Sequence, residues 1–343
     1  MPDMIKFSRR SILFMPLALA ACKGSAARVF NLSGLTMGTA YNVVAIDSSK
    51  SVNEADVKAA INGALAEVNQ QMSNWDTNSE ISRFNAAANT APVQVSPELA
   101  HVMKAADTVY TASEGRFDTT MGPLIELWGF GAPGKRPMPQ QAEIDNALAA
   151  VGHHNTISVG ANALQKKQAD AQVYLAAIGK GYGADRVGQA LESFGITDYL
   201  VEIGGDLYAS GRNPDGLPWQ IGIETPASLN NGIFDVVGIS GLGLASSGDY
   251  RNYFEKDGQR YSHVIDPATG QPITHRTASA TVLAENSMMA DAWATAMLIL
   301  GRERGLEIAA QHDVAVLFVE RDTEASSLQF KSSASDAFTR LTA

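Results

Sequence analysis

The chain is poor in cysteine and in charge. Cys22 is the only cysteine among 343 residues, so no disulfide can form within the chain. Charged residues make up 18% of the sequence, and acidic residues outnumber basic ones to give a formal net charge of −10. Proteins that bind nucleic acid need a basic face, and the body of this chain has no basic patch with interleaved aromatic residues. We therefore expect no nucleic-acid partner.

Long hydrophobic runs are also absent, apart from one near the N-terminus. There Arg9 and Arg10 precede an apolar run over 12–21, which is shorter than the roughly 20 residues that a membrane-spanning helix needs. The run ends in Leu-Ala-Ala-Cys, which resembles a bacterial lipobox with Cys22 as the acylated residue, and "SRRSIL" resembles a twin-arginine export signal. An ordinary cleaved secretory signal with an incidental cysteine is the alternative interpretation.

This N-terminal pattern predicts a location as well as a boundary. We expect residues 1–22 to be a lipoprotein signal segment and residues 23–343 to form one catalytic unit. A lipidated Cys22 would anchor the protein on the periplasmic side of a bacterial inner or outer membrane.

The remaining chain has an ordinary globular composition, with 45% hydrophobic residues. Helical and strand periodicities are mixed without regular alternation, which indicates an α+β fold. Expected helices lie at 52–72, 97–113, 142–151, 180–194, 287–300 and 302–311; a strand pair lies at 29–46; further β structure lies at 156–178, 199–209, 219–224, 234–240, 249–265, 277–284, 314–320 and 328–331.

One glycine-rich stretch is a candidate phosphate site. In "LAAIGKGYGADRV" (175–187), Gly179, Gly181 and Ala184 formally fit a dinucleotide-binding fingerprint, with Glu202 further on. The following sequence does not continue as βαβ units, which disfavours a Rossmann domain. A strand-to-helix turn that offers backbone N–H groups and Lys180 to a phosphate is a second interpretation, and close backbone packing without any ligand is a third.

Three further stretches carry candidate oxygen or nitrogen ligands. Asp291 and Thr295 are four residues apart in a predicted helix, so both side chains lie on one face and form a partial oxygen shell for Mg²⁺; the alternative is a helix-start acid and a hydroxyl bonded to its own helix. In "YSHVIDPATG" (261–270), His263 is a candidate proton carrier or a structural hydrogen-bonding group. Asp266 in the same stretch is a turn residue by its position before a proline, and "ASSGDYRNYF" (245–254) is either a ligand grip or a plain turn.

Taken in order, these stretches resemble the ApbE-type FAD:protein FMN transferase family. The similarity runs from about residue 30 to residue 320 and is carried by the motifs "MGTAY" (37–41), "QQMSNWDTNSEISRFN" (70–85), "GRFDTTMGPLIELWGFG" (115–131), "AIGKGYGADR" (177–186), "VEIGGDLYASG" (201–211), "SSGDYRNYFEKDGQRYSHVIDPATGQPI" (246–273) and "ADAWATAMLILG" (290–301).

The resemblance implies a T-fold-like α+β architecture and a Mg²⁺-dependent enzyme with FAD as its substrate. Such an enzyme transfers FMN to a threonine hydroxyl of a target flavoprotein through a phosphoester bond and releases AMP. The acceptors it implies are flavin-carrying subunits of membrane redox complexes.

Matching the motifs residue by residue assigns candidate site positions. The resemblance implies a catalytic role for His263, as a proton acceptor, and for Asp291. It implies metal ligation by the carbonyl of Ala177 and by the side chains of Asp291 and Thr295. It implies flavin binding by Met37, Trp75, Arg116, Phe117, Asp118, Lys180 and Ile265.

Two positions depart from the family pattern. Tyr174 stands where the family usually has an aspartate, and Ala294 stands where some relatives have a second aspartate beside the metal. The first change affects contacts with FAD, and the second lowers the negative charge of the metal site. Two alternative functions therefore stay open: an FAD pyrophosphatase that yields FMN and AMP, and a non-catalytic flavin-binding lipoprotein.

Overall fold

The structure is a computed structural model that describes residues 27–343, apart from 132–133, 135, 228–231, 258 and 323–328. The predicted signal segment, its Cys22 and Gly258 at the predicted hairpin turn lie outside the described residues. Within the described part of the chain, no helix is long and apolar enough to cross a membrane.

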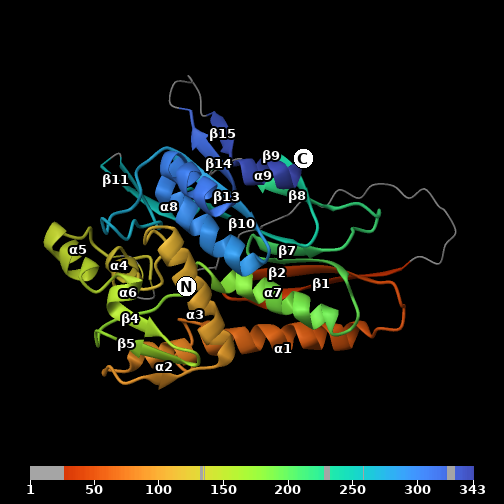
Figure 1. The fold of residues 1–343 in the computed structure, drawn as a ribbon, viewed down its shortest axis with the longest axis horizontal. Helices are drawn as coiled ribbons and strands as arrows, with labels where there is room; N and C mark the ends of the chain where they lie inside the picture. Colours follow the sequence, from red (N-terminus) through yellow and green to blue (C-terminus); the bar gives the residue numbers. More distant parts are fainter. Residues whose placement is uncertain (1–26, 132–133, 135, 228–231, 258, 323–328) are drawn as a thin grey trace, which may run out of the picture.

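A large antiparallel sheet forms the centre of the molecule (Figure 1). Its eight strands lie in the order β1-β2-β6-β7-β10-β13-β14-β15. They are β1 (Arg28–Thr36), β2 (Thr39–Asp47), β6 (Asp198–Ile203), β7 (Asp206–Ser210), β10 (Leu242–Gly248), β13 (Thr277–Ala284), β14 (Ala315–Arg321) and β15 (Phe330–Ala334). The combination of this sheet with packed helices confirms the predicted α+β class.

The β1–β2 hairpin is tight and ends at a residue of the candidate site. Thr36 pairs with Thr39, so only Met37 and Gly38 form the loop, and their φ angles of 49° and 70° are both positive. This is the backbone geometry that a two-residue hairpin requires. The predicted strand pair with a bend at residues 37–39 is confirmed.

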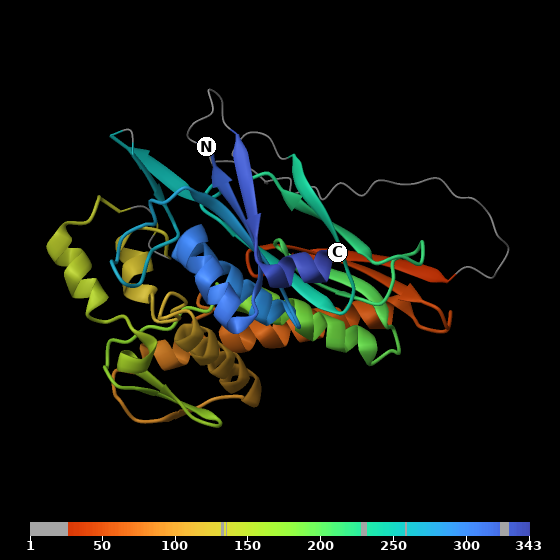
Figure 2. The same cartoon turned by 45° about the horizontal axis from the view of Figure 1, so that its top comes forward.

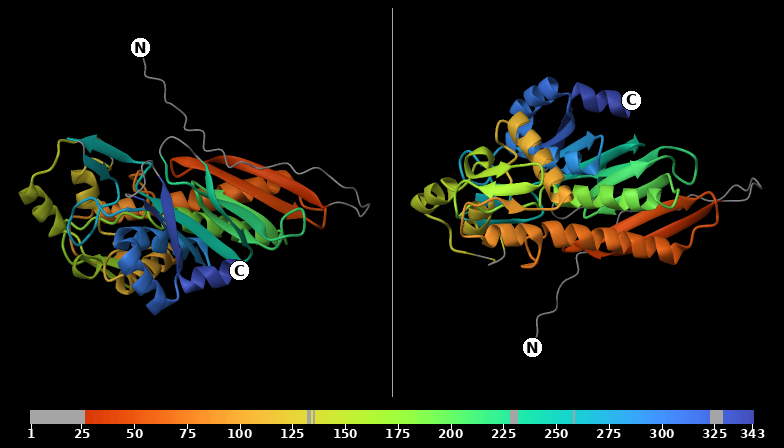
Figure 3. Two further views of the ribbon diagram at one scale, coloured as in Figure 1. Left: turned by 90° about the horizontal axis from the view of Figure 1, so that it is seen from above. Right: turned by 60° about the horizontal axis from the view of Figure 1, so that its bottom comes forward.

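Two helices pack on the β1-β2-β6 end of this sheet (Figure 3). α1 (Glu54–Met72) contributes Val57, Ile61 and Leu65, and α7 (Gly179–Glu192) contributes Val187 and Leu191 to one apolar cluster with the strands. The cluster fixes the direction of α7, whose first turn belongs to the candidate site.

The long helix α8 (Ser287–His312) packs against β10, β13 and β14 and begins close to α7. The backbone leaves helical geometry at Gly301, with φ 70° and ψ 173°, which confirms the two predicted helices at 287–300 and 302–311. Asp185 of α7 accepts hydrogen bonds from the N–H groups of Ser287 (2.8 Å) and Met288 (2.9 Å). This carboxylate caps α8 and joins the two helices.

A smaller lobe lies beside the sheet (Figure 2). It contains α2 (Glu80–Ala86), α3 (Pro97–Ala112), α4 (Gly122–Leu127), α5 (Gln141–Leu148), α6 (His153–Thr156) and the strands β3 (Val93–Gln94), β4 (Ile157–Val159) and β5 (Ala163–Lys166). The predicted β structure at 156–178 is wrong beyond residue 166. There the backbone bonds to asparagine side chains instead of a strand, as when Asn74 bonds to Val173 and Leu175.

The remaining elements are two small sheets and a terminal helix, namely β8 (Trp219–Glu224), β9 (Ile233–Ile239), β11 (Tyr253–Lys256), β12 (Gln259–Ser262) and α9 (Asp336–Thr342). The strand predicted to run to Ile265 ends at Ser262, and Ile265 forms only an isolated bridge with Pro272. The sequence prediction missed β10, because its serines and glycines lack a strand's hydrophobic alternation.

Candidate active site

The first turns of α7 and α8 approach so closely that only glycine fits between them. A Cβ atom added at Gly181 would lie 2.2 Å from the carbonyl oxygen of Ser287, and one added at Gly183 would lie 2.8 Å from Cε of Met37. These glycines therefore serve close packing, one of the three interpretations of this stretch. The strand pairs around α7 are antiparallel, so the dinucleotide fingerprint does not belong to a Rossmann βαβ unit.

This close approach brings a lysine between two carboxylates. Nζ of Lys180, in the first turn of α7, lies 2.5 Å from Oδ2 of Asp206 and 3.5 Å from Oδ1 of Asp291. The other oxygen of Asp291 accepts a hydrogen bond from the N–H of Gly181 at 3.1 Å. Asp206 comes from the start of β7, directly after a turn made by Gly204 and Gly205. Three elements thus contribute to one charged cluster.

Burial determines the electrostatics of this cluster. Burial alone would lower the pKa of Lys180, but the carboxylates of Asp206 and Asp291 more than offset this and raise it above its ordinary range. Burial, followed by repulsion from Asp206, raises the pKa of Asp291, and Lys180 opposes both effects. The cluster carries two acids and one base, so it has room for additional positive charge.

The other predicted metal ligands come from α8 and from the segment before α7. Thr295 lies one turn further along α8, and its Oγ1 is 3.1 Å from Oγ of Ser247 in β10. Ala177 lies two residues before α7. Among the described residues, no group of three His, Cys, Asp or Glu side chains could hold a metal ion. A cation here would therefore need hydroxyl, carbonyl or substrate oxygens besides Asp291.

His263 follows β12, and one of its nitrogens has a defined partner. Both its backbone N–H and its Nδ1 lie 3.0 Å from the carbonyl oxygen of Asn252. A carbonyl only accepts, so Nδ1 carries the proton and Nε2 has a free lone pair in the neutral ring. The side chain of His263 is exposed to solvent. Partial desolvation by neighbouring atoms lowers its pKa, the Asn252 carbonyl and Asp249 raise it in part, and Lys180 lowers it slightly. The ring therefore favours its neutral, proton-accepting form.

Several predicted flavin positions lie near this histidine or beside α7. Arg116 Nε lies 3.6 Å from Oδ1 of Asp266, in the turn after His263. Ile265 is buried against the smaller lobe. Met37 packs on α7, as described above. Trp75 is 71% exposed and follows Asn74, which bonds to the segment that leads into α7. An exposed tryptophan ring is available for stacking on a ligand.

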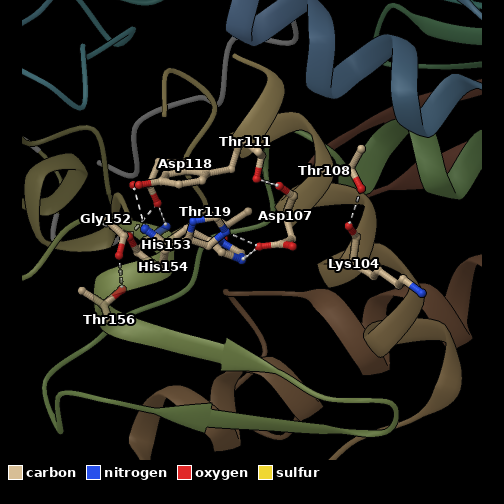
Figure 4. A network of polar contacts seen from close by, with 12 residues as sticks. Lys104, Asp107, Thr108, Thr111, Asp118, Thr119, Gly152, His153, His154 and Thr156 are labelled. Atoms are coloured by element: carbon tan, nitrogen blue, oxygen red, sulfur yellow. Dashed lines mark hydrogen bonds and ion pairs between the residues drawn. The ribbon is translucent and has the colours of Figure 1, made fainter. Parts of the chain in front are cut away.

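Two predicted flavin positions, Phe117 and Asp118, have side chains that make contacts within the protein. Phe117 is buried in the main core. The carboxylate of Asp118 accepts hydrogen bonds from the N–H (2.7 Å) and hydroxyl (2.6 Å) of Thr120. It also accepts one from the N–H of His153 at 3.2 Å (Figure 4). Burial raises the pKa of Asp118, although these bonds lower it in part. The side chain of Asp118 thus joins the segment after α3 to α6, and the structure gives it no contact with the lysine cluster.

Two cavities lie near the middle of α8, around its break at Gly301. One of about 460 Å³ is lined by Arg260, Asp266 and Ile299, among others, and so borders the turn after His263. The other, of about 570 Å³, lies at the break around Gly301 and contains none of the predicted site residues. The first cavity provides space beside Asp266 for part of a ligand.

The geometry can be compared with known proteins. The model of the ApbE family matches residues 37–318, which is most of the chain. The chain belongs to the ApbE family. The FAD:protein FMN transferase of Vibrio cholerae is 41% identical to it over 324 residues, covering 94% of this chain and 95% of the relative. The FAD:protein FMN transferase of Escherichia coli K12 is 37% identical over 346 residues, covering 96% and 97%.

Solved structures agree with this assignment. The flavin transferase ApbE from Vibrio cholerae matches with a TM-score of 0.84 and 38% identity, covering 92% of this chain and 99% of that one. The flavinyl transferase ApbE from Pseudomonas stutzeri, in its apo form, matches with a TM-score of 0.83 and 35% identity, covering 92% and 97%. This ApbE-family chain is an FAD:protein FMN transferase, an enzyme that transfers FMN from FAD to a target protein.

The ApbE-family site contains residues that sequence reasoning missed. Asp206 and Ser247 contact predicted residues that lie far from them in the chain, and Asn252 lies eleven residues before His263. Ser247 and Asn252 belong to the stretch 245–254 that was interpreted as a ligand grip or a plain turn. For Asp206 the local indication is the motif "IGGD", because paired glycines mark a turn that delivers the next side chain. At the first departure from the family, the hydroxyl of Tyr174 donates to Oε1 of Glu126 at 2.9 Å. At the second, Ala294 is fully buried, on α8 beside Thr295.

Proposed function

We propose that this FMN transferase modifies a threonine hydroxyl of its target and requires Mg²⁺. The observation that carries the proposal is the cluster of Lys180, Asp206 and Asp291 between two helix N-termini, together with His263, whose Nδ1 is held by the Asn252 carbonyl. Cationic groups and helix N-termini favour an anion such as a pyrophosphate, and a neutral histidine can take a proton from a hydroxyl.

The donor set fits magnesium. The Asp291 carboxylate, the Thr295 hydroxyl and the Ala177 carbonyl are oxygen donors, which Mg²⁺ prefers, and it commonly completes its shell with water and substrate phosphate. When bound, the ion would supply charge neutralisation for the pyrophosphate. Among the described residues, the polar partners of the Asp291 carboxylate are Lys180, Gly181 and Asp206, and a movement of Lys180 would vacate the position beside Oδ1 that Nζ now takes.

The protein residues then divide the reaction between them. The oxygen of the acceptor threonine forms a bond to the phosphorus on the FMN side of FAD, the bond from that phosphorus to the bridging oxygen breaks, and AMP leaves with that oxygen. Nε2 of His263 takes the threonine proton, because Nδ1 is held by Asn252. Lys180 and the amides of the α7 N-terminus bind the phosphate oxygens. Trp75 and Met37 flank the flavin or adenine.

A covalent-transfer assay tests this proposal. The enzyme is incubated with FAD, Mg²⁺ and a candidate acceptor domain, with and without chelator, and protein is separated by denaturing electrophoresis. Fluorescent acceptor that appears only with Mg²⁺, and disappears when the acceptor threonine is changed to valine, supports the proposal. Free FMN and AMP without labelled protein would indicate the pyrophosphatase alternative, and retained intact FAD would indicate the flavin-storage alternative.

The role of His263 gives a separate prediction. H263A is expected to lower kcat by about 10²–10⁴-fold, the usual contribution of a general base, with little change in FAD affinity. His312, which is exposed at the end of α8 and lines neither cavity, provides a matched control as H312A. Unchanged transfer by H263A would remove His263 from the mechanism.

The proposals about membrane anchoring and partner proteins rest on the sequence alone. We propose that the enzyme is lipidated at Cys22, lies on the periplasmic side of a bacterial membrane and modifies flavin-carrying subunits of membrane redox complexes, since tethering raises the effective concentration of such partners. Metabolic labelling with a fatty-acid analogue tests the anchor. Label in the full chain and none in C22S supports it, whereas equal labelling contradicts it.

A further inference from the structure

The hairpin that leads into His263 is attached to the main sheet through one buried carboxylate. Asp249 directly follows β10 and is 7% exposed. Its two oxygens accept hydrogen bonds from Nη1 (2.9 Å) and Nη2 (2.6 Å) of Arg321, at the end of β14. A two-point bond of a guanidinium to a carboxylate fixes orientation as well as distance.

A second arginine connects the same aspartate to the hairpin. Nη2 of Arg260, in β12, donates to the carbonyl oxygen of Asp249 at 2.6 Å and lies 3.8 Å from its carboxylate. The Arg260 guanidinium also lies 4.0 Å from the centre of the Tyr253 ring in β11. Asp249 is therefore held both by a strand of the main sheet and by both strands of the hairpin.

The attachment leads directly to the candidate base. Three residues after Asp249, the carbonyl of Asn252 accepts from the backbone N–H and from Nδ1 of His263, both at 3.0 Å. The ring of Phe130 meets His263 edge-on, with centroids 6.2 Å apart. A shift of the 249–252 segment would move the carbonyl that selects the tautomer of His263 and so change where Nε2 points.

We propose that the Asp249–Arg321 ion pair is a positioning device for His263 in FMN transfer. Neither residue is among the predicted flavin or metal positions. Together they hold the 249–252 segment so that the Asn252 carbonyl keeps the proton on Nδ1 and the lone pair of Nε2 on the acceptor side. This inference rests on the proposed role of His263 as the base.

The competing interpretation is that the ion pair only stabilises the sheet by joining the ends of β10 and β14, which lie on either side of β13. A neighbouring ion pair allows the two to be separated. One residue before Arg321, Glu320 lies 2.8 Å from Nε of Arg302 in α8. This pair is also partly buried and starts from the same strand, but it leads to the helix and not to the hairpin. E320Q is therefore the matched control.

The first experiment compares D249N, R321Q and E320Q in full-length enzyme under single-turnover conditions. D249N and R321Q are each expected to lower kcat by about 10²-fold, the usual cost of misplacing a catalytic group by about 1 Å, with the FAD dissociation constant changed by less than about 3-fold. E320Q should retain the wild-type kcat. Equal losses in all three variants, or losses that appear only in FAD affinity, would overturn the proposal.

The second experiment is a double-mutant cycle with H263A. If Asp249 acts through His263, D249N/H263A should be no slower than H263A alone. If the losses in kcat of D249N and H263A multiply in the double variant, the ion pair has a purely structural role. A slow H263A single variant would still support His263 as the base. If H263A transfers FMN at the wild-type rate, the proposed role of His263 as the base is wrong. This result differs from multiplicative losses, which contradict only the positioning role of the Asp249–Arg321 pair. Thermal melts of each variant, with D249E and R321K as conservative partners, identify any loss that follows from unfolding.

The pH profile gives a third readout. The charged groups that face His263 are Asp249, after β10, which raises its pKa, and Lys180, from α7, which lowers it; the Asn252 carbonyl and the Phe130 ring complete its surroundings. Loss of the Asp249 charge should therefore move the acid limb of kcat/KM to lower pH. The proposed coupling between Asp249 and His263 is contradicted if the acid limb of kcat/KM in D249N stays at the wild-type pH and kcat falls by the same factor at every pH.

Discussion

At the scale of single residues, Asp291 combines two tasks that substitution can separate. Its Oδ2 accepts the Gly181 N–H, and its Oδ1 faces Lys180. An asparagine can keep the first bond, but it cannot balance Lys180 or bind a divalent cation as a charged ligand. Because burial already opposes the ionised form, loss of the charge is not expected to weaken the fold.

We therefore predict that D291N keeps a melting temperature within a few degrees of wild type while FMN transfer falls by at least about 10²-fold, a typical loss for removal of one group that stabilises the transition state. Transfer is followed by in-gel flavin fluorescence. D313N, which removes a surface carboxylate paired with Arg340, is the control and should transfer normally. A D291N enzyme with wild-type activity would contradict the predicted site.

The same residues show which contacts of the site can be predicted from local sequence patterns. Helical spacing placed Asp291 and Thr295 on one face, and the structure has them on α8 beside Lys180 and Ser247. Ser247 could not be paired with Thr295 in advance, because their contact depends on how distant elements meet. The predicted hairpin, by contrast, brings Asn252 opposite His263 once its register is known. Asp118 shows another limit. Its role in flavin binding stays a prediction, and the motif gave no indication that its carboxylate also accepts hydrogen bonds from Thr120 and His153.

At the scale of elements, the site depends on how closely α7 and α8 approach. The periodicity of the sequence predicted both helices well, because their buried faces are continuous, whereas the short helices α2, α4 and α6 were not predicted because they span too few residues to show a period. No sequence pattern indicated that Gly181 touches the backbone of Ser287, since this contact joins two elements that are distant in the chain.

G181A tests the importance of this contact. The added methyl group would meet the Ser287 carbonyl at 2.2 Å, and a backbone atom cannot move as a flexible side chain can. We expect destabilisation of about 1–3 kcal/mol, the usual cost of overpacking, with loss of transfer because Lys180 and Asp291 separate. Urea unfolding measures the first effect. G179A is the control on the same helix, since nothing lies within 4 Å of its added Cβ, and equal stability of the two variants would contradict the close packing.

At the scale of the whole molecule, buried acids link stability to pH. Burial raises the pKa of Asp185 to about 7 despite its two bonds to α8, and burial also raises the pKa of Asp118 and Asp291. Such groups bind more protons in the folded state than in the unfolded state, so their contribution to stability is complete below the unfolded pKa and is lost as the pH rises through the folded one. Burial lowers the pKa of His153 to about 4, which has the opposite effect, but only up to its ordinary value of 6.5.

Above pH 6.5 the carboxylates therefore dominate, and we predict that the free energy of unfolding falls between about pH 6.5 and pH 8. One proton bound only by the folded state corresponds to a slope of about 1.4 kcal/mol per pH unit. D185N removes one titrating group, so it should be less stable overall, because one of the bonds to α8 is lost, but its profile in this range should be flatter. Urea unfolding at several pH values measures both quantities. D313N, at an exposed ion pair, should keep the wild-type slope, and a D185N slope as steep as wild type would show that Asp185 is not a source of the pH dependence.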